Sequence, residues 1–202
     1  MSCIKPITHP LPSPKISLKD LINLYKKSLN PHCCHGTSMY GDLNEVLAFK
    51  MKSTQVFLKR CVCNRNRHQR RLPNVAVDNA VSKLFSSPNV WSVCHADFED
   101  LYDNIYNLIG NGNTGVSYCT VYDTAIRLGW TFSPQIVPEK YVYVHRKLVE
   151  SAKHILKSSY VIINKCRIDR SLFDKKEPTF KKLSALEIED FLCVYHDDIM
   201  KL

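Results

Sequence analysis

The segment from Ile109 to Leu128 contains the residues whose types and spacing most favour ligand chemistry. Small residues at its centre precede two variable positions and a threonine, in the order Gly115-Val116-Ser117-Tyr118-Cys119-Thr120-Val121. This order is typical of a tight hairpin that turns directly into a helix. Backbone N–H groups at a helix start lack intrahelical acceptors and bind phosphate. We therefore expect Gly115, Val116 and Ser117 to offer N–H groups to a phosphate. The alternative is a plain Gly- and Asn-rich connection between two helices.

Positive charge is concentrated in the first third of the chain. Residues 1–75 contain 13 Lys and Arg against 3 Asp and Glu, whereas the whole chain carries a net charge of +9. The densest run contains Arg65, Arg67, Arg70 and Arg71. A planar guanidinium can donate two hydrogen bonds to one phosphate, so this run indicates a polyanionic partner, nucleic acid above all. A solvated basic loop is the alternative interpretation.

Two short clusters carry the residue types that bind zinc. Cys33 and His35 belong to the first cluster, and Cys61 and Cys63 belong to the second. Zinc takes about four nitrogen or sulfur ligands in tetrahedral geometry, but neither cluster has the C-x-x-C spacing of familiar zinc modules. We expect free thiols and no cofactor, with zinc as the alternative. The nine cysteines, together with no signal-like segment and no bilayer-length apolar run, indicate a reducing, intracellular compartment.

The spacing of apolar residues predicts the elements that position these groups. Two capping boxes, Ser17 with Asp20 and Ser184 with Glu187, predict the starts of the first and last helices. We expect an all-α chain with an irregular Pro-rich arm over 1–16 and one helical domain over 17–202, with a hairpin at 110–117. Gly129 is the expected C-cap of the helix after the hairpin. The expected helices cover about 18–29, 42 to 60–64, 75–85, 98–109, 117–128, 139–157 and 185–199, and a β-like run covers 160–163.

The run Gly115-Val116-Ser117-Tyr118-Cys119-Thr120-Val121 resembles the hairpin of the helix-hairpin-helix DNA glycosylase superfamily. The pattern of that family is Gly, apolar, Gly, two variable residues, Ser or Thr, and a small residue. Leu128-Gly129-Trp130 is similar to the exit from the family's second helix, and Val142-Tyr143-Val144-His145 resembles its Val-Asp-x-His element, which begins the next helix. The resemblance covers roughly residues 95–155. It implies an all-α, two-lobed domain that binds duplex DNA.

The departures from this pattern lie at the residues that carry its chemistry. Ser117 replaces the second glycine, Cys119 stands at the place of the lyase lysine, and Tyr143 stands at the place of the catalytic aspartate. A neutral phenol is a poor substitute for a carboxylate that stabilises positive charge on a sugar. Asp123 and Glu139 are nearby carboxylates outside the motif, and Glu139 would more simply interact with the N-terminal dipole of the following helix.

Three functions follow from these patterns. The first is a protein that binds nucleic acid, duplex DNA above all, without catalysis. The second is a base-excision enzyme that uses a displaced carboxylate such as Asp123 or Glu139, with Tyr143 at the motif position. The third is a helical adaptor, with or without zinc, whose basic surface meets an acidic protein.

Overall fold

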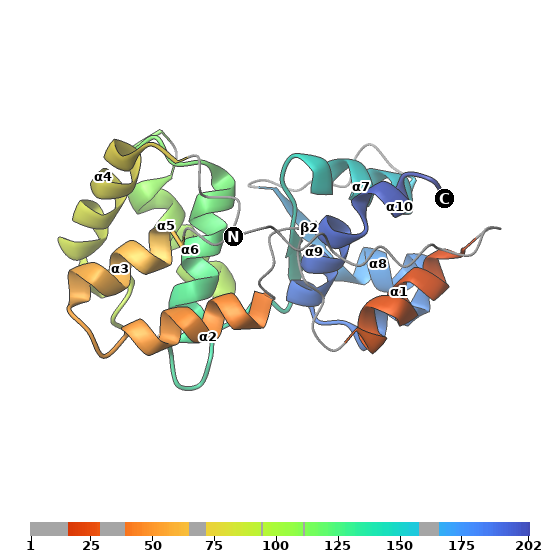
Figure 1. The fold of residues 1–202 in the computed structure, drawn as a ribbon, viewed down its shortest axis with the longest axis horizontal. Helices are drawn as coiled ribbons and strands as arrows, with labels where there is room; N and C mark the ends of the chain where they lie inside the picture. Colours follow the sequence, from red (N-terminus) through yellow and green to blue (C-terminus); the bar gives the residue numbers. More distant parts are fainter. Residues whose placement is uncertain (1–15, 29–38, 65–71, 94, 111, 158–165) are drawn as a thin grey trace, which may run out of the picture. The chain divides into compact units, whose positions relative to one another are not determined.

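The computed structural model describes residues 16–28, 39–64, 72–93, 95–110, 112–157 and 166–202 (Figure 1). Most of these residues are helical, and the described part contains two short strands. This confirms the expected all-α class in its coarse sense. The chain divides into two compact units. Unit 1 contains the residues up to Met39 together with Lys140–Leu202, and unit 2 is the continuous stretch Tyr40–Glu139.

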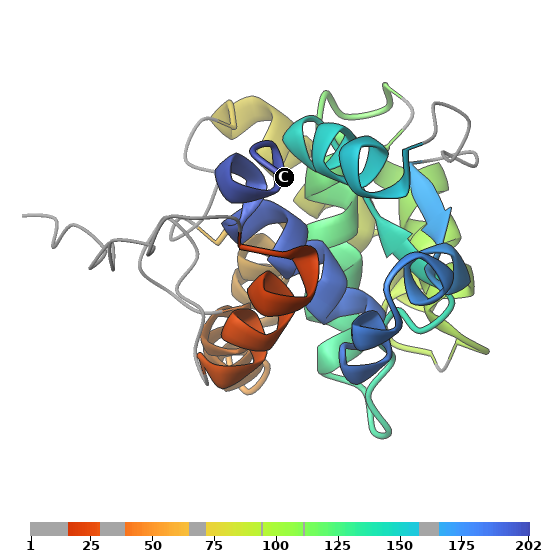
Figure 2. The same cartoon turned by 90° about the vertical axis from the view of Figure 1, so that its right-hand side faces the viewer.

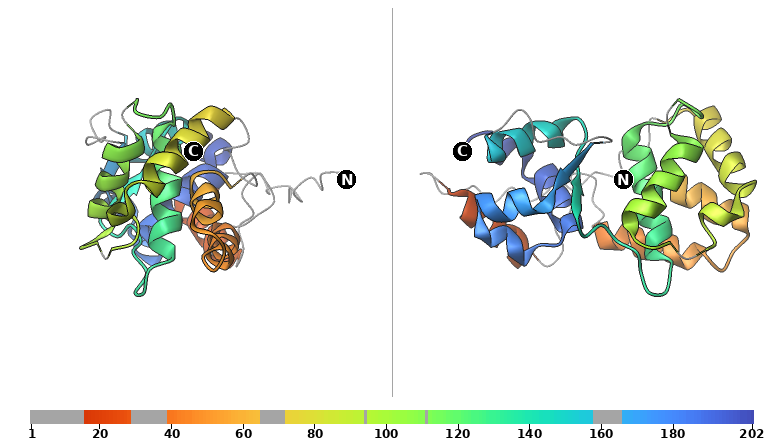
Figure 3. Two further views of the ribbon diagram at one scale, coloured as in Figure 1. Left: turned by 90° about the vertical axis from the view of Figure 1, so that its left-hand side faces the viewer. Right: turned by 180° about the vertical axis from the view of Figure 1, so that it is seen from behind.

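Unit 2 is built from helices that pack against one another (Figure 3). Its elements are α2 (Met39–Phe49, whose first residue is assigned to unit 1), α3 (Thr54–Val62), α4 (Asn74–Phe85), the 3-10 helix η2 (Pro88–Val90), α5 (Phe98–Ile109) and α6 (Tyr118–Trp130). Helix α6 packs against both α5 and α3, and α3 packs against α4. The core includes the fully buried side chains of Leu58, Leu84, Leu101, Ile105, Val121 and Leu128.

A buried polar network joins three helices of unit 2. The Arg127 side chain of α6 is 2% exposed, and its Nε donates to Asp42 Oδ2 of α2 at 2.9 Å. Its Nη1 donates to the carbonyl of Cys61 in α3 at 3.0 Å. Asn64 Nδ2 donates to the other carboxylate oxygen of Asp42 at 2.8 Å. Because a buried charge is costly without a partner, this network fixes α6 relative to α2 and α3.

Two of the expected boundaries in unit 2 are wrong. The single helix expected from 42 to 60–64 is broken, since α2 ends at Phe49 and Ser53 caps α3 by accepting from the N–H of Val56. Gly129 is not a C-cap but lies inside α6, which ends at Trp130 and has Thr131 as its C-cap. A Cβ at Gly129 would lie 2.1 Å from the carbonyl oxygen of Ile136. This glycine therefore permits a close backbone approach.

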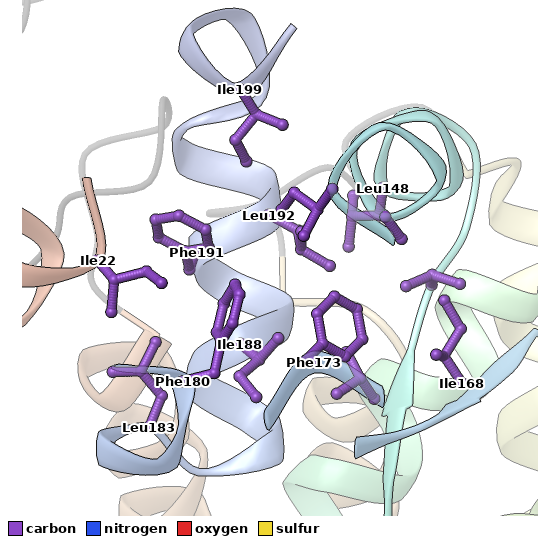
Figure 4. Close-up of a cluster of buried hydrophobic side chains, with 14 of the residues drawn as sticks. Ile22, Leu148, Ile168, Phe173, Phe180, Leu183, Ile188, Phe191, Leu192 and Ile199 are labelled. Carbon is purple, nitrogen blue, oxygen red and sulfur yellow. The ribbon is translucent and has the colours of Figure 1, made fainter. Parts of the chain in front are cut away.

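Unit 1 combines helices with a two-stranded antiparallel sheet (Figure 2). Strand β1 (Tyr141–Tyr143) pairs with β2 (Arg167–Asp169), and Val142 lies opposite Ile168. The helices are α1 (Leu18–Lys27), α7 (Lys147–Leu156), α8 (Arg170–Lys176), the 3-10 helix η3 (Pro178–Lys182), α9 (Ala185–Val194) and α10 (His196–Ile199). Figure 4 shows Phe173, Phe180 and Phe191 at the centre of the apolar cluster, with α9 passing between Ile22 of α1 and Leu148 of α7.

Local capping signals are confirmed in unit 1, but the helix expected over 139–157 is wrong. Both capping boxes, Ser17 with Asp20 and Ser184 with Glu187, are formed. The stretch that follows Lys140 is strand β1, and α7 begins only at Lys147. Aromatic and β-branched residues favour a strand when a partner is present, and that partner is β2, which lies far along the chain. The β-like run at 160–163 and the arm up to residue 15 lie outside the described residues.

Candidate nucleic-acid interface

Helices α5 and α6 are joined by residues 110–117, called here the α5–α6 turn. The N–H of Asn113 donates to the carbonyl of Gly110 at 2.9 Å, and Thr114 Oγ1 donates to the carbonyl of Ile109 at 2.6 Å. Gly112 and Gly115 have φ values of +78° and +81°, in the left-handed region that favours glycine. The turn thus occupies the expected residues and depends on two of its glycines.

Gly115 and Ser117 play different backbone roles in this turn. Gly115 needs its left-handed conformation, and a Cβ there would lie 3.7 Å from the Cβ of Ala76 in α4. Ser117 has φ −83° and ψ 164°, an extended conformation open to any residue. The serine that stands where the glycosylase hairpin pattern has its second glycine therefore causes no strain. Its Oγ accepts from the N–H of Thr120 at 3.4 Å and so caps α6.

Three consecutive backbone N–H groups of the turn remain open. Across the part of the chain that the structure describes, the N–H groups of Gly115, Val116 and Ser117 have no hydrogen-bond acceptor. Gly115 and Ser117 are exposed, whereas Val116 is buried and anchors the turn to the core. Helix α6 has no acidic residue in its first turn, so its N-terminal dipole is not neutralised there. This arrangement can accept an anion.

An aromatic side chain stands directly beside these N–H groups. Tyr118 is the first residue of α6, and its side chain is 46% exposed. Its ring stacks on that of Tyr106 in α5, with ring centroids 5.4 Å apart and an interplanar angle of 22°. In the sequence Tyr118 occupies one of the two variable positions of the hairpin pattern, and nothing there identifies Tyr106 as its partner. The only signal for Tyr106 was its place on the apolar face of α5, four residues after Tyr102.

The basic run Arg65, Arg67, Arg70 and Arg71 lies outside the described residues. The residues that flank this run are described: Asn64 follows α3, and Leu72 shortly precedes α4. In the sequence, Arg71 comes five residues before Ala76, the residue that approaches Gly115. The covalent chain therefore ties this run to the helix that borders the α5–α6 turn.

The three candidate catalytic residues lie on three different segments of the chain. Asp123 lies on α6, and its Oδ2 is 3.9 Å from the Sγ of half-buried Cys119, which donates to it. Glu139 is exposed in the segment between α6 and β1, and not at a helix start as expected. Tyr143 is 2% exposed in β1 of unit 1, where the guanidinium of Arg167 lies 5.5 Å from its ring centroid.

The candidate zinc ligands fall in different environments. Cys61 is fully buried, and burial raises the pKa of its thiol far above the usual value, which disfavours the thiolate that zinc requires. Cys63 is half-buried at the end of α3, and Cys33 and His35 lie outside the described residues. No group of three or more His, Cys, Asp or Glu is placed to hold a metal within the ranges the structure describes. Zinc binding by these residues stays a prediction.

Comparison of the chain with protein-family models, with curated proteins and with solved structures finds no match. Among the helices described, none is both long enough and apolar enough to cross a membrane.

Proposed function

We propose that the α5–α6 turn binds a phosphate of the nucleic-acid backbone, and that the protein binds duplex DNA through it in the manner of a helix-hairpin-helix. The observation that carries this proposal is the set of three open N–H groups at Gly115, Val116 and Ser117, at the start of a helix of 13 residues. N–H groups in this position, together with the positive end of the helix dipole, form an anion site.

The charge distribution favours a polyanion over a small anion. The excess positive charge lies in residues 1–75, and its densest run is tied to α4, which borders the turn. A helix N-terminus fixes one phosphate, and surrounding arginines then contribute most of the affinity through counterion release. The resemblance of residues 115–121 to the glycosylase hairpin supports DNA as the polyanion. Because the turn offers only backbone groups, we expect binding to depend little on sequence.

Binding without base excision is the function we propose. Tyr143, at the place of the family's catalytic aspartate, is a buried phenol, and Cys119 stands at the place of the lyase lysine. Neither side chain can supply the carboxylate or the amine that these reactions use.

The first test places a negative charge at the turn and keeps the helix cap. Aspartate is as good an N-cap as serine, so Ser117→Asp should preserve α6 while repelling a phosphate. We expect its affinity for a fluorescently labelled DNA duplex to fall by about tenfold or more at low salt, with unchanged thermal stability. The wild-type affinity should itself decrease steeply as salt is raised.

The matched control is Ser53→Asp. Ser53 is also an exposed N-cap in unit 2, and its side chain accepts from the N–H of Val56 in α3. This substitution makes the same change in net charge at a helix start outside the turn, so the affinity should stay close to that of the wild type. Equal losses in the two variants would contradict the proposal, as would wild-type affinity in Ser117→Asp.

A further inference from the structure

Three tyrosines of unit 2 form a stack that runs from the core to the surface. Tyr102 is 1% exposed, Tyr106 is 8% exposed and Tyr118 is 46% exposed. The rings of Tyr102 and Tyr106 are stacked with centroids 6.2 Å apart and an interplanar angle of 15°. Tyr118 continues the stack at 5.4 Å from Tyr106. The stack therefore ends in an exposed ring, one face of which is covered by Tyr106.

The exposed ring is held in a fixed orientation. The hydroxyl oxygens of Tyr118 and Tyr106 are 3.1 Å apart and share a hydrogen bond. Tyr106 is also the one ring that Tyr118 contacts within the described part of the chain. A side chain fixed at both its ring face and its hydroxyl loses little conformational entropy when a ligand stacks on it. The outer face of Tyr118 is thus a preorganised flat surface.

The kind of ligand that this surface can bind follows from its position beside the open N–H groups. Tyr118 directly follows Ser117, so the ring and the anion site are separated by a single peptide unit. A nucleotide carries a planar base and a phosphate joined by one sugar, and bases stack on exposed aromatic rings in nucleic-acid-binding proteins. In a continuous duplex both faces of each base are covered by neighbouring bases. Only an unpaired or displaced base can therefore offer a face to Tyr118.

We propose that Tyr118 is a base-stacking residue, and that the site selects DNA with an unpaired base next to the phosphate bound by the turn. This inference rests on the proposed function, since the turn must first bind the backbone. It adds a preference that phosphate binding alone does not produce. The ligand class is a duplex interrupted by a bulged, gapped or flipped nucleotide.

The test compares two duplexes of the same sequence, one fully paired and one carrying a single unpaired 2-aminopurine. The wild-type protein should bind the interrupted duplex about tenfold more tightly and should quench the 2-aminopurine fluorescence by stacking. Tyr118→Ala should lose both the preference and the quenching while still binding the paired duplex. Tyr118→Phe keeps the ring and should retain both. Tyr118→Leu, which keeps an apolar side chain on Tyr106 but has no planar face, should behave like Tyr118→Ala.

Phe85→Ala is the control, because Phe85 is an aromatic residue of α4 in the same unit and is 56% exposed. It should retain the preference and the quenching. If Tyr118→Ala and Tyr118→Leu kept the wild-type preference, the stacking role would be wrong and the backbone proposal would stand. If the wild-type protein bound neither duplex in a salt-dependent way, both proposals would fail.

Discussion

One buried cation holds the helix that carries the candidate site. Arg127 of α6 reaches Asp42 and the carbonyl of Cys61, and all three groups are removed from solvent. Truncating one member of such a pair leaves the other charge buried without its partner. The placement of α6 against α2 and α3 therefore depends on Arg127.

We predict that Arg127→Met lowers the free energy of unfolding by about 3–5 kcal/mol, because Asp42 would lose its guanidinium partner in the core. Chemical denaturation followed by far-ultraviolet circular dichroism measures the change. The control is Lys59→Met, which removes an ion pair with Asp78 whose side chains are 55% and 60% exposed. We expect that substitution to cost less than about 1 kcal/mol. Equal losses in the two variants would contradict the role given to Arg127.

The residues of the site were only partly predictable from the sequence. The turn at 110–117 was foreseen because glycine and serine act through local backbone preferences. The open N–H groups of Gly115, Val116 and Ser117 were also expected, because the first N–H groups of a helix have no intrahelical acceptor. The stack of Tyr106 on Tyr118 joins two helices, so periodicity on either helix gives no signal for it.

Among the secondary-structure elements, features fixed by interactions between residues close in sequence were predicted correctly, whereas a strand fixed by a distant partner was not. The starts of the helices capped by Ser17 and Ser184 were predicted from their capping boxes, whose residues lie within four positions of one another. Strand β1 was missed because its partner β2 lies more than twenty residues away in the sequence. A local pattern of aromatic and valine residues is compatible with either element, and tertiary pairing decides between them.

Acid should weaken unit 1 through the cap of α8. Asp169 Oδ1 accepts from the N–H of Ser171 at 2.8 Å, and this hydrogen bonding holds the pKa of the Asp169 carboxyl below its usual value. A lowered pKa stabilises the fold above the unfolded-state value of 3.8, and the stabilisation is lost as pH falls through the folded-state value. We predict that the melting temperature decreases as pH falls below about 4.

Asp169→Asn tests this assignment. Asparagine also caps helices through its side-chain oxygen but does not titrate, so α8 should still form at neutral pH. Its melting temperature should decrease less steeply below about pH 4 than that of the wild type. Parallel melting curves for the two proteins across this pH range would show that the Asp169 cap contributes nothing to acid sensitivity.

In the whole molecule, all the described groups of the candidate nucleic-acid site belong to one continuous segment of the chain. Unit 2 is the stretch Tyr40–Glu139, and it contains the α5–α6 turn, the tyrosine stack and the Arg127 network. Unit 1 is assembled from both ends of the chain. A segment with its own apolar core and its own buried ion pair has what an independently folding domain requires.

We therefore predict that a fragment of residues 39–139, which begins with the first residue of α2, folds cooperatively and retains binding to a paired DNA duplex. Thermal unfolding measures its folding, and fluorescence anisotropy at several salt concentrations measures its affinity. The logarithm of the affinity should fall with the logarithm of the salt concentration at the same slope in the fragment as in the full chain. This slope is proportional to the number of phosphates that the protein neutralises, and the fragment includes the basic run at 65–71. Ser117→Asp in the fragment should weaken binding as it does in the full chain. A folded fragment with a much shallower salt dependence would mean that unit 1 contacts the backbone as well.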